Sequence, residues 1–379
     1  MIFNRKLLKN LDLAFIITVV VVLIMGLLIL SSATLNVNTD QWFFVKKQIL
    51  WIIIGLFSLF VVLLFDYGVL FRYTRYIYAF NIILLLAVLL VGSTAKGAQL
   101  WLSLGPLGGQ PSELAKVMVI ITFAAFLTKR QDRMERLRDL LPAFLHIGIP
   151  VFLILLQPDL GTSLVFFAIM FGMLYVAGAR SSLLLKLLGA GLLLIIAALV
   201  GHVKFGLPLP LEDYQIRRLI VFIDPYMDGR GGRGAGWHVI QSLVAIGSGG
   251  FWGKGLFNGT QVQGNFLPEH HTDFIFSVVG EELGFLGASL LLGLYFVLLY
   301  RVLQIAFKSR DQFGTLIAVG VASMWGFHIL QNVGMSIGIM PITGIPLPFL
   351  SYGGSSMLAN LISVGLLLNI SLRREKILF

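Results

Sequence analysis

The chain has 379 residues, of which 58% are hydrophobic and only 12% are charged. Soluble domains contain roughly 25% charged residues, so this composition indicates an integral membrane protein and excludes the soluble classes. Cysteine is absent, which excludes disulfides, thiolate chemistry and cysteine-based metal sites, and the net charge of +10 is better explained by membrane topology than by a nucleic-acid partner.

Apolar segments of spanning length, or close to it, recur along the whole chain. The first follows a basic start and lacks a small-residue cleavage site, so we expect a retained anchor and not a cleaved signal peptide. The fourth and fifth segments are short for a bilayer. We predict an all-α integral membrane protein with about ten transmembrane helices, at 13–31, 47–65, 74–92, 113–128, 141–157, 160–178, 183–201, 273–300, 314–337 and 354–371.

Basic residues in the short connections predict the orientation, because they favour the cytoplasmic side. One side of the membrane receives most of them, whereas the short loops on the other side hold only Lys46, Lys47 and Lys96. Both termini are therefore expected in the cytoplasm, and the long connection 202–272, between the seventh and eighth helices, is expected outside. The basic residues of the cytoplasmic side are Arg5, Lys6, Lys9, Arg72, Arg75, Lys129, Arg130, Arg133, Arg136, Arg138, Arg180, Lys186, Arg301, Lys308, Arg310, Arg373, Arg374 and Lys376.

The segment KGAQLWLSLGPLGGQPSELAKV, residues 96–117, places polar groups at the outer end of the fourth helix. Ser112 is a candidate N-cap, and Glu113 and Lys116 are three residues apart, so a capped helix with an internal ion pair explains them structurally. Trp101 is equally suited to anchor the membrane interface. Ionisable groups in a span also indicate function, which leaves Glu113 and Lys116 as candidate site residues.

The long connection is rich in glycine and carries several cations. Its glycines formally match a dinucleotide fingerprint, but no strand precedes them, so we reject that assignment. Solvated charge explains any one cation, whereas the group suits a phosphate-bearing ligand, because arginine presents a planar fork to phosphate oxygens. These cations are Arg217, Arg218, Arg230, Arg233 and Lys254.

LPEHHTDFIFSVVGEELG, residues 267–284, gathers ionisable side chains at the start of the eighth helix. We expect Thr272 to cap this helix and Asp273 to lie in its first turn, where the helix dipole favours a carboxylate. Asp273 and Glu281 would be about 12 Å apart along the axis and turned by about 80°. That separation exceeds the roughly 5–9.5 Å of glycosidase carboxylate pairs, so a two-carboxylate hydrolase is not expected.

The same segment raises two further questions. Glu281 and Glu282 would be costly inside a span and should find partners or water. The adjacent His270 and His271 diverge and no second ligand set has recognisable spacing, so we predict no metal site here.

Residues 332–356, NVGMSIGIMPITGIPLPFLSYGGSS, form a Pro- and Gly-rich turn between the last two helices. Gly353 and Gly354 permit unusual backbone conformations at membrane depth, although packing alone could account for them.

Four motifs together resemble the SEDS family of bacterial cell-wall proteins. They are QPSELAK at 110–116, YQIRRLIVFIDP at 214–225, LPEHHTDFIFSVVGEELG at 267–284 and PLPFLSYGGSS at 346–356. They stand in family order over most of the chain, which makes the resemblance very specific. GTQVQGNFLPEHHTDFIF is more similar to the elongation branch of the family than to the division and sporulation branches.

The resemblance implies one polytopic membrane domain over 1–379, in the bacterial cytoplasmic membrane, with 202–272 as an extracytoplasmic loop. It implies a peptidoglycan glycosyltransferase that polymerises lipid II into glycan strands on the outer face of that membrane during elongation. Asp273 matches the essential acidic residue of the family, and positions tied to substrate binding and activity match Trp101, Glu113, Lys116 and Arg218. A class B penicillin-binding protein and other elongation-complex membrane proteins are the implied partners.

Asp273 would then accept the proton of the attacking sugar hydroxyl, and Lys116 and Arg218 would stabilise the departing pyrophosphate. A divalent cation could share the second task, although no ligand set in the sequence requires one. Two alternatives remain: a lipid II flippase, which buried acids and broken helices would suit, and a non-catalytic scaffold, in which Asp273 would be dispensable.

Overall fold

The computed structural model describes residues 11–37, 40–95, 98–101, 108–130, 134, 136–206, 213–227, 234 and 236–374. Within these ranges nine helices are long and apolar enough to cross a membrane, and a tenth apolar helix, α7, has 17 residues. The prediction of about ten spans is confirmed. The ten are α2 (Leu13–Ala33), α3 (Phe43–Leu64), α4 (Gly68–Val91), α5 (Pro111–Thr128), α6 (Leu137–Leu155), α7 (Leu160–Val176), α8 (Ser181–Phe205), α12 (Ile275–Phe307), α13 (Gln312–Ser336) and α14 (Gly354–Leu372).

The helix ends differ from the predicted ones in ways that have physical causes. α6 begins at Leu137, earlier than expected, because Asp139 accepts a hydrogen bond from the backbone N–H of Arg136 and so closes its first turn. A two-stranded antiparallel hairpin, β1 (Ser93–Ala95) with β2 (Ala98–Trp101), follows α4. Strands of three and four residues are too short to give an alternating pattern, so the all-α prediction missed them.

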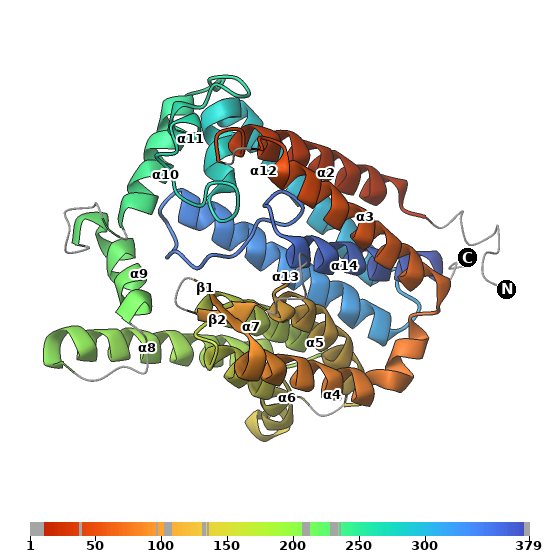
Figure 1. Ribbon diagram of the computed structural model, residues 1–379. Helices are drawn as coiled ribbons and strands as arrows, with labels where there is room; N and C mark the ends of the chain where they lie inside the picture. Colours follow the sequence, from red (N-terminus) through yellow and green to blue (C-terminus); the bar gives the residue numbers. More distant parts are fainter. Residues whose placement is uncertain are drawn as a thin grey trace.

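α13 and α14 run through the middle of the molecule (Figure 1). α13 packs on α12, α5 and α7, and α14 packs on α3 and α5, so the central helices join two groups of spans. The group drawn above them in Figure 1 contains α2, α3 and α12, and the group below contains α4, α5, α6 and α7. α2 begins and α14 ends on the same side of the bundle, as an even number of spans requires.

α8 extends away from both groups (Figure 1) and makes its few contacts with α7. Most of its described side chains are exposed, among them Leu193 and Leu194 at 68% and 71%. Lipid tails are as apolar as leucine, so such a helix is stable when it faces lipid.

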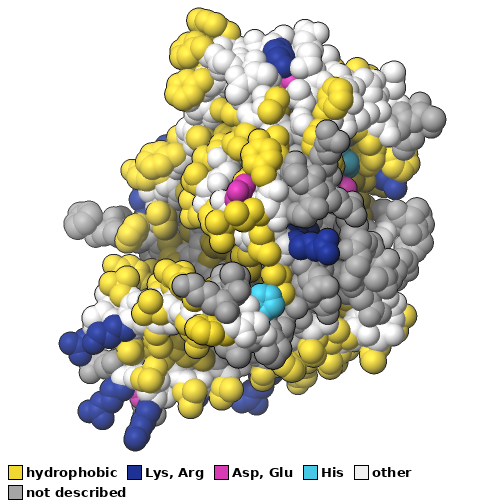
Figure 2. Space-filling view, turned by 90° about the vertical axis from the view of Figure 1, so that its left-hand side faces the viewer, with side chains coloured by type: hydrophobic (Ala, Val, Ile, Leu, Met, Phe, Trp, Pro, Cys, Tyr) yellow, Lys and Arg dark blue, Asp and Glu magenta, His cyan; other side chains and the backbone are white. Residues whose placement is uncertain are grey.

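The connection between α8 and α12 contains further helices. They are α9 (Asp213–Ile223), the short 3₁₀ helix η1 (Pro225–Met227), α10 (Gly236–Gly249) and α11 (Thr260–Gln263). α10 packs against α12. Figure 2 views the side of the molecule to which α8 and α10 extend, and hydrophobic side chains cover much of its described surface.

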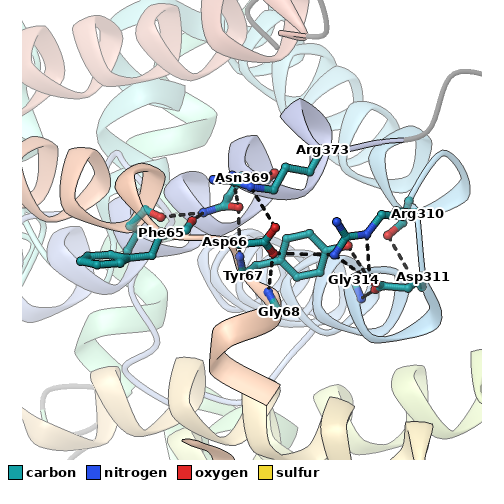
Figure 3. A network of polar contacts seen from close by, with 11 residues as sticks. Phe65, Asp66, Tyr67, Gly68, Arg310, Asp311, Gly314, Asn369 and Arg373 are labelled. Atoms are coloured by element: carbon teal, nitrogen blue, oxygen red, sulfur yellow. Dashed lines mark hydrogen bonds and ion pairs between the residues drawn. The ribbon is translucent and has the colours of Figure 1, made fainter. Parts of the chain in front are cut away.

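On the opposite side, a polar network joins the α3–α4 connection, the α12–α13 connection and the end of α14 (Figure 3). Asp66 lies 3.3 Å from the Nε of Arg373 and 3.7 Å from a guanidinium nitrogen of Arg310. The buried amide of Asn369 donates to the carbonyls of Val62 (2.6 Å) and Phe65 (2.7 Å). α14 is thereby fixed to the turn between α3 and α4.

We expect Asn369→Leu to lower the free energy of unfolding by about 1 kcal/mol or more, because it removes the donor of two partly buried hydrogen bonds. Thermal unfolding of the purified protein in detergent measures this. Arg310→Ala removes a partly exposed ion pair of the same network and should shift the unfolding temperature much less. Equal shifts for the two variants would contradict the assignment of Asn369 as the main link.

Candidate active site

A cavity of about 400 Å³ opens at the end of the bundle opposite the Asp66 network. Five separate parts of the chain line it: the start of α5, the connection between α6 and α7, α9, the turn before α12, and the connection between α13 and α14. Successive spans run in opposite directions, so the start of α5, the end of α6 and the start of α12 meet at one face of the membrane. Its polar lining comprises Gln110, Glu113, Lys116, Asp159, Thr162, Gln215, Arg218, Asp273 and Thr343.

Four of the five predicted site residues therefore meet in one cavity: Glu113, Lys116, Arg218 and Asp273. The backbone of the fifth, Trp101, lies in β2, and its side chain lies outside what the structure describes.

Glu113 and Lys116 form a buried ion pair on α5, with 2.7 Å between the Oε1 and Nζ atoms and side chains only 7% and 2% exposed. The expected N-cap, Ser112, is not the cap: α5 begins at Pro111, and Gln110 occupies the N-cap position. Proline at the first helical position needs no N–H partner, which explains the earlier start. The ion pair interpretation is confirmed.

A third residue completes this group. The Nε2 atom of His328, on α13, lies 3.2 Å from Nζ of Lys116, and His328 is 1% exposed. An ammonium group only donates hydrogen bonds, so Nε2 must accept and the imidazole is neutral. Nζ of Lys116 thus lies between a carboxylate oxygen and a ring nitrogen at the wall of the cavity. The sequence analysis did not find His328, because a lone histidine in an apolar helix has no motif around it.

Asp159 is a third acidic residue of the cavity, in addition to Glu113 and Asp273, and the sequence analysis missed it. It caps α7: its Oδ1 accepts from the N–H of Thr162 at 2.9 Å, and its Oδ2 accepts from Oγ1 of Thr162 at 2.7 Å and from Nε2 of Gln110 at 3.0 Å. Burial raises the pKa of Asp159, and the hydrogen bonds from Thr162 oppose that change. An acid between two spans, in QPDLGTS, was the available signal.

Asp273 lies in a turn that precedes α12 and not, as expected, in the first turn of the helix. α12 begins at Ile275 with Phe274 at the N-cap position and no side-chain cap, so Thr272 does not cap it. The N–H groups of Thr272, Asp273 and Phe274 all bond to the carbonyl of Glu269, which has a φ of +53°. This tight turn replaces the predicted first turn of the helix.

Gly344 forms the cavity wall next to the carboxylate. Its φ is +73°, a conformation that other residues rarely adopt, and a Cβ at this position would lie 3.3 Å from Oδ2 of Asp273. The backbone can therefore approach the acid closely only because residue 344 has no side chain.

The three described cations of the long connection do not gather in one place. Arg218, on α9, lines the cavity, whereas Arg217 is exposed and is not among the lining residues. Arg230 and Arg233 lie outside the described residues. Lys254 is occupied elsewhere, 2.7 Å from Oε1 of Glu281.

Glu281 and Glu282 find the partners that the sequence analysis required. The fully buried Glu281 binds Lys254 and accepts from the N–H groups of Gln261 (2.9 Å) and Val262 (3.2 Å). Glu282 accepts from the hydroxyl of Ser32 on α2. Glu281 therefore attaches the segment before α12 to that helix, and Glu282 attaches α12 to α2; neither acid is among the residues that line the cavity.

Replacing Lys254 with methionine should lower the free energy of unfolding by about 3 kcal/mol, because it leaves the Glu281 charge buried without its cation. Thr260→Val, which removes a neutral hydroxyl beside the same carboxylate, should cost about 1 kcal/mol. Thermal unfolding of both variants measures the difference. An unchanged unfolding temperature for Lys254→Met would show that the backbone donors alone satisfy Glu281.

The described residues contain no group of three His, Asp or Glu side chains arranged to hold a metal ion. His270 is instead buried with both ring nitrogens close to backbone carbonyls, those of Leu267 (2.5 Å) and Ala33 (2.7 Å). The described side chains that line the cavity include no such group of three.

Comparison with known proteins gives concordant results. A family model described as "Cell cycle protein", that of FtsW, RodA and SpoVE, matches residues 12–376. The "Probable peptidoglycan glycosyltransferase FtsW" of Trichlorobacter lovleyi is 37% identical over 369 residues, which cover 95% of this chain and 93% of that protein. The "Peptidoglycan glycosyltransferase MrdB" of Escherichia coli K12 is 41% identical over 300 residues, which cover 79% of this chain and 78% of that protein.

A solved structure described as "Structural coordination of polymerization and crosslinking by a peptidoglycan synthase complex" contains a similar chain. It superposes with a TM-score of 0.76 at 32% identity, and the match covers 96% of this chain and 98% of that one. The similarity thus extends over nearly the whole bundle of spans, and over every part of the chain that lines the cavity.

Proposed function

The chain belongs to the FtsW, RodA and SpoVE family of cell cycle proteins, also called SEDS proteins, and from that premise we propose that it polymerises lipid II as a peptidoglycan glycosyltransferase. The observation that carries the proposal is the cavity, which holds the carboxylate of Asp273 together with the cations Lys116 and Arg218 at one face of a multi-pass membrane protein. A sugar–pyrophosphate substrate on a lipid tail needs both kinds of group at that depth.

In the proposed reaction, the ionised Asp273 accepts the proton of the acceptor sugar's 4-hydroxyl. The hydroxyl oxygen forms a bond to the anomeric carbon of the donor, and the bond from that carbon to the pyrophosphate oxygen breaks. Attack from the opposite side inverts the anomeric configuration. The departing group takes the electron pair as polyprenyl pyrophosphate.

The leaving pyrophosphate gains negative charge, and Lys116 and Arg218 stabilise it within a partly enclosed site. The guanidinium of Arg218 offers paired donors to phosphate oxygens. Lys116 is oriented by its contacts with Glu113 and His328, which hold its charge at the cavity wall. Trp101 is proposed to contact the sugar or phosphate at the cavity entrance.

We propose that the cavity faces outward from the cytoplasmic membrane and that both termini are cytoplasmic. The distribution of basic residues supports this: outside the long connection, the described Lys and Arg near the outer ends of the spans are Lys46 and Lys47 near the start of α3 and Lys116 on α5, whereas many Lys and Arg lie at the other ends. The whole chain would form one membrane domain, with 202–272 as its extracytoplasmic segment. A class B penicillin-binding protein, other elongation-complex proteins and a role in elongation are parts of the same proposal, supported by a structural neighbour that comes from a peptidoglycan synthase complex.

Reconstitution tests the proposal against its two alternatives. The purified protein in liposomes receives lipid II, with and without a class B penicillin-binding protein whose transpeptidase is inactivated, and glycan polymer is resolved on a gel. An inhibitor of the classical glycosyltransferases excludes a contaminating synthase. Polymer in its presence supports the glycosyltransferase.

The same liposomes distinguish the alternatives. Transfer of labelled lipid II between leaflets without polymer would overturn the proposal in favour of a flippase. If the correctly assembled partner complex gives neither polymer nor transfer, the proposal is overturned in favour of a non-catalytic scaffold.

A further inference from the structure

The turn that carries Asp273 is fixed from outside by three consecutive hydrogen bonds. The carbonyl of His271 accepts from the N–H of Tyr352 at 2.9 Å, and that of Thr272 accepts from Oγ of Ser351 at 2.6 Å. The carbonyl of Asp273 accepts from Nδ2 of Asn332 at 2.8 Å. All three donors come from α13 or from the connection between α13 and α14.

We infer that Asn332 and Ser351 are positioning residues, which set the direction in which the Asp273 carboxylate enters the cavity; this rests on the proposed role of Asp273. Neither residue is among those that line the cavity, so neither is placed to touch substrate. Their effect on the reaction would pass through the backbone of residues 272 and 273.

α12 itself cannot supply this control. It begins at Ile275 without a side-chain cap, so the carboxylate lies before the regular helical hydrogen bonds. Inside the turn, the N–H groups of residues 272–274 share the single carbonyl of Glu269. The carbonyls of residues 271–273 accept hydrogen bonds from Tyr352, Ser351 and Asn332. These donors therefore determine the position of the turn relative to the bundle.

Asn332 joins the two walls of the cavity on either side of the carboxylate. It is fully buried, and its one amide nitrogen also donates to the carbonyl of Ile345 at 2.8 Å. Ile345 lines the cavity next to Gly344, the residue that approaches Oδ2 of Asp273. Both N–H bonds of the amide are thereby used, one for the turn and one for the facing wall.

Ser351 makes a similar link with a single hydroxyl. Its Oγ accepts from the N–H of Leu347 at 2.8 Å while it donates to Thr272, and the residue is 4% exposed. The hydroxyl thus ties the PLPFLSYGG segment into a compact loop and attaches that loop to the turn. The motif at 346–356 therefore has a structural role that its sequence alone did not indicate: it holds the turn that carries Asp273.

A general base must lie within hydrogen-bond reach of the proton that it accepts, and a displacement of about 1 Å can cost about a hundredfold in rate. Loss of a positioning bond should therefore lower kcat and leave substrate affinity nearly unchanged. We expect Ser351→Ala and Asn332→Leu to lower kcat about tenfold or more, with KM for lipid II within about twofold of the wild type.

Gln331→Met is the matched control. Gln331 is also a buried amide on α13, and it donates to the carbonyl of Pro341 at 2.8 Å, in the same connection but away from residues 271–273. Loss of this hydrogen bond in Gln331→Met should leave kcat within about threefold of the wild-type value. Ser351→Thr keeps the hydroxyl and should recover most of the kcat lost in Ser351→Ala.

Hydrogen–deuterium exchange of the peptide containing residues 272–274 provides a readout that needs no activity. Ser351→Ala should exchange faster there than the wild type and Gln331→Met should not, while the unfolding temperature of both stays within a few degrees. Faster exchange with a fall in kcat supports the inference. Unchanged exchange, or a rise in KM without a fall in kcat, overturns it.

If the wild-type protein makes no polymer, the proposed function fails. The exchange experiment then still decides whether Ser351 holds the turn: faster exchange in Ser351→Ala would retain the structural link, and equal exchange would remove it.

Discussion

Asp273→Asn is expected to lower the rate of glycan polymerisation by at least about a hundredfold, since a positioned general base contributes typically 10²–10⁴-fold. The amide has nearly the same shape as the carboxylate but cannot accept the proton of the attacking hydroxyl. The rate is measured with purified protein and lipid II, as the appearance of polymer on a gel. The unfolding temperature should remain close to that of the wild type, because the turn is held by backbone groups.

Glu269→Gln is the control for this experiment. It makes the same change of carboxylate to amide four residues earlier, in the same turn, at a residue that is not among those lining the cavity. Its rate should stay within about threefold of the wild type. Polymerisation by Asp273→Asn at more than a tenth of the wild-type rate would remove Asp273 as the base, and an equal loss in both variants would indicate a disturbed turn.

Lys116→Met is expected to abolish measurable polymerisation and also to destabilise the protein. The variant loses the cation proposed to face the pyrophosphate, and it leaves Glu113 buried without a partner, which costs about 3–5 kcal/mol. Polymerisation assays and thermal unfolding of the same preparations measure the two effects.

The double variant Glu113→Gln/Lys116→Met separates these effects. Removing both charges should restore much of the lost stability, because no unpaired ion remains in the interior, but it should not restore polymer. Recovery of polymer in the double variant would show that Lys116 acts only by neutralising Glu113. Full stability in Lys116→Met alone would contradict the buried ion pair.

The spans were predictable because each must supply a long apolar segment, whereas the site was predictable only in part. Glu113, Lys116 and Asp273 could be found as ionisable groups at the ends of spans, and the direction of the spans places these ends at one face. Their meeting in one cavity depends on how α5, α12 and α13 pack, which no local pattern encodes.

The missed residues have specific physical reasons. His328 is 212 positions away from Lys116 in sequence and contacts it only through helix packing. Asn332 donates hydrogen bonds to two backbone carbonyls. Every residue carries a backbone carbonyl, so no side-chain motif in the sequence marks the partners of Asn332. The predicted Thr272 cap failed because the carbonyl of Glu269 attracts three successive N–H groups and delays the start of α12.

The segments that line the cavity are spread between Gln110 and Pro346, so the ribosome synthesises them at different times. Chains emerge from the ribosome at about 5–20 residues per second, the N-terminal part first. α5 and its buried ion pair would enter the membrane well before α13 brings His328 and Asn332, and the turn of Asp273 would lack two of its three outside hydrogen bonds until residues 351 and 352 arrive. A nascent or truncated chain that lacks the last hairpin therefore has the acid and the cations but no assembled site, so it cannot begin an unregulated glycan strand.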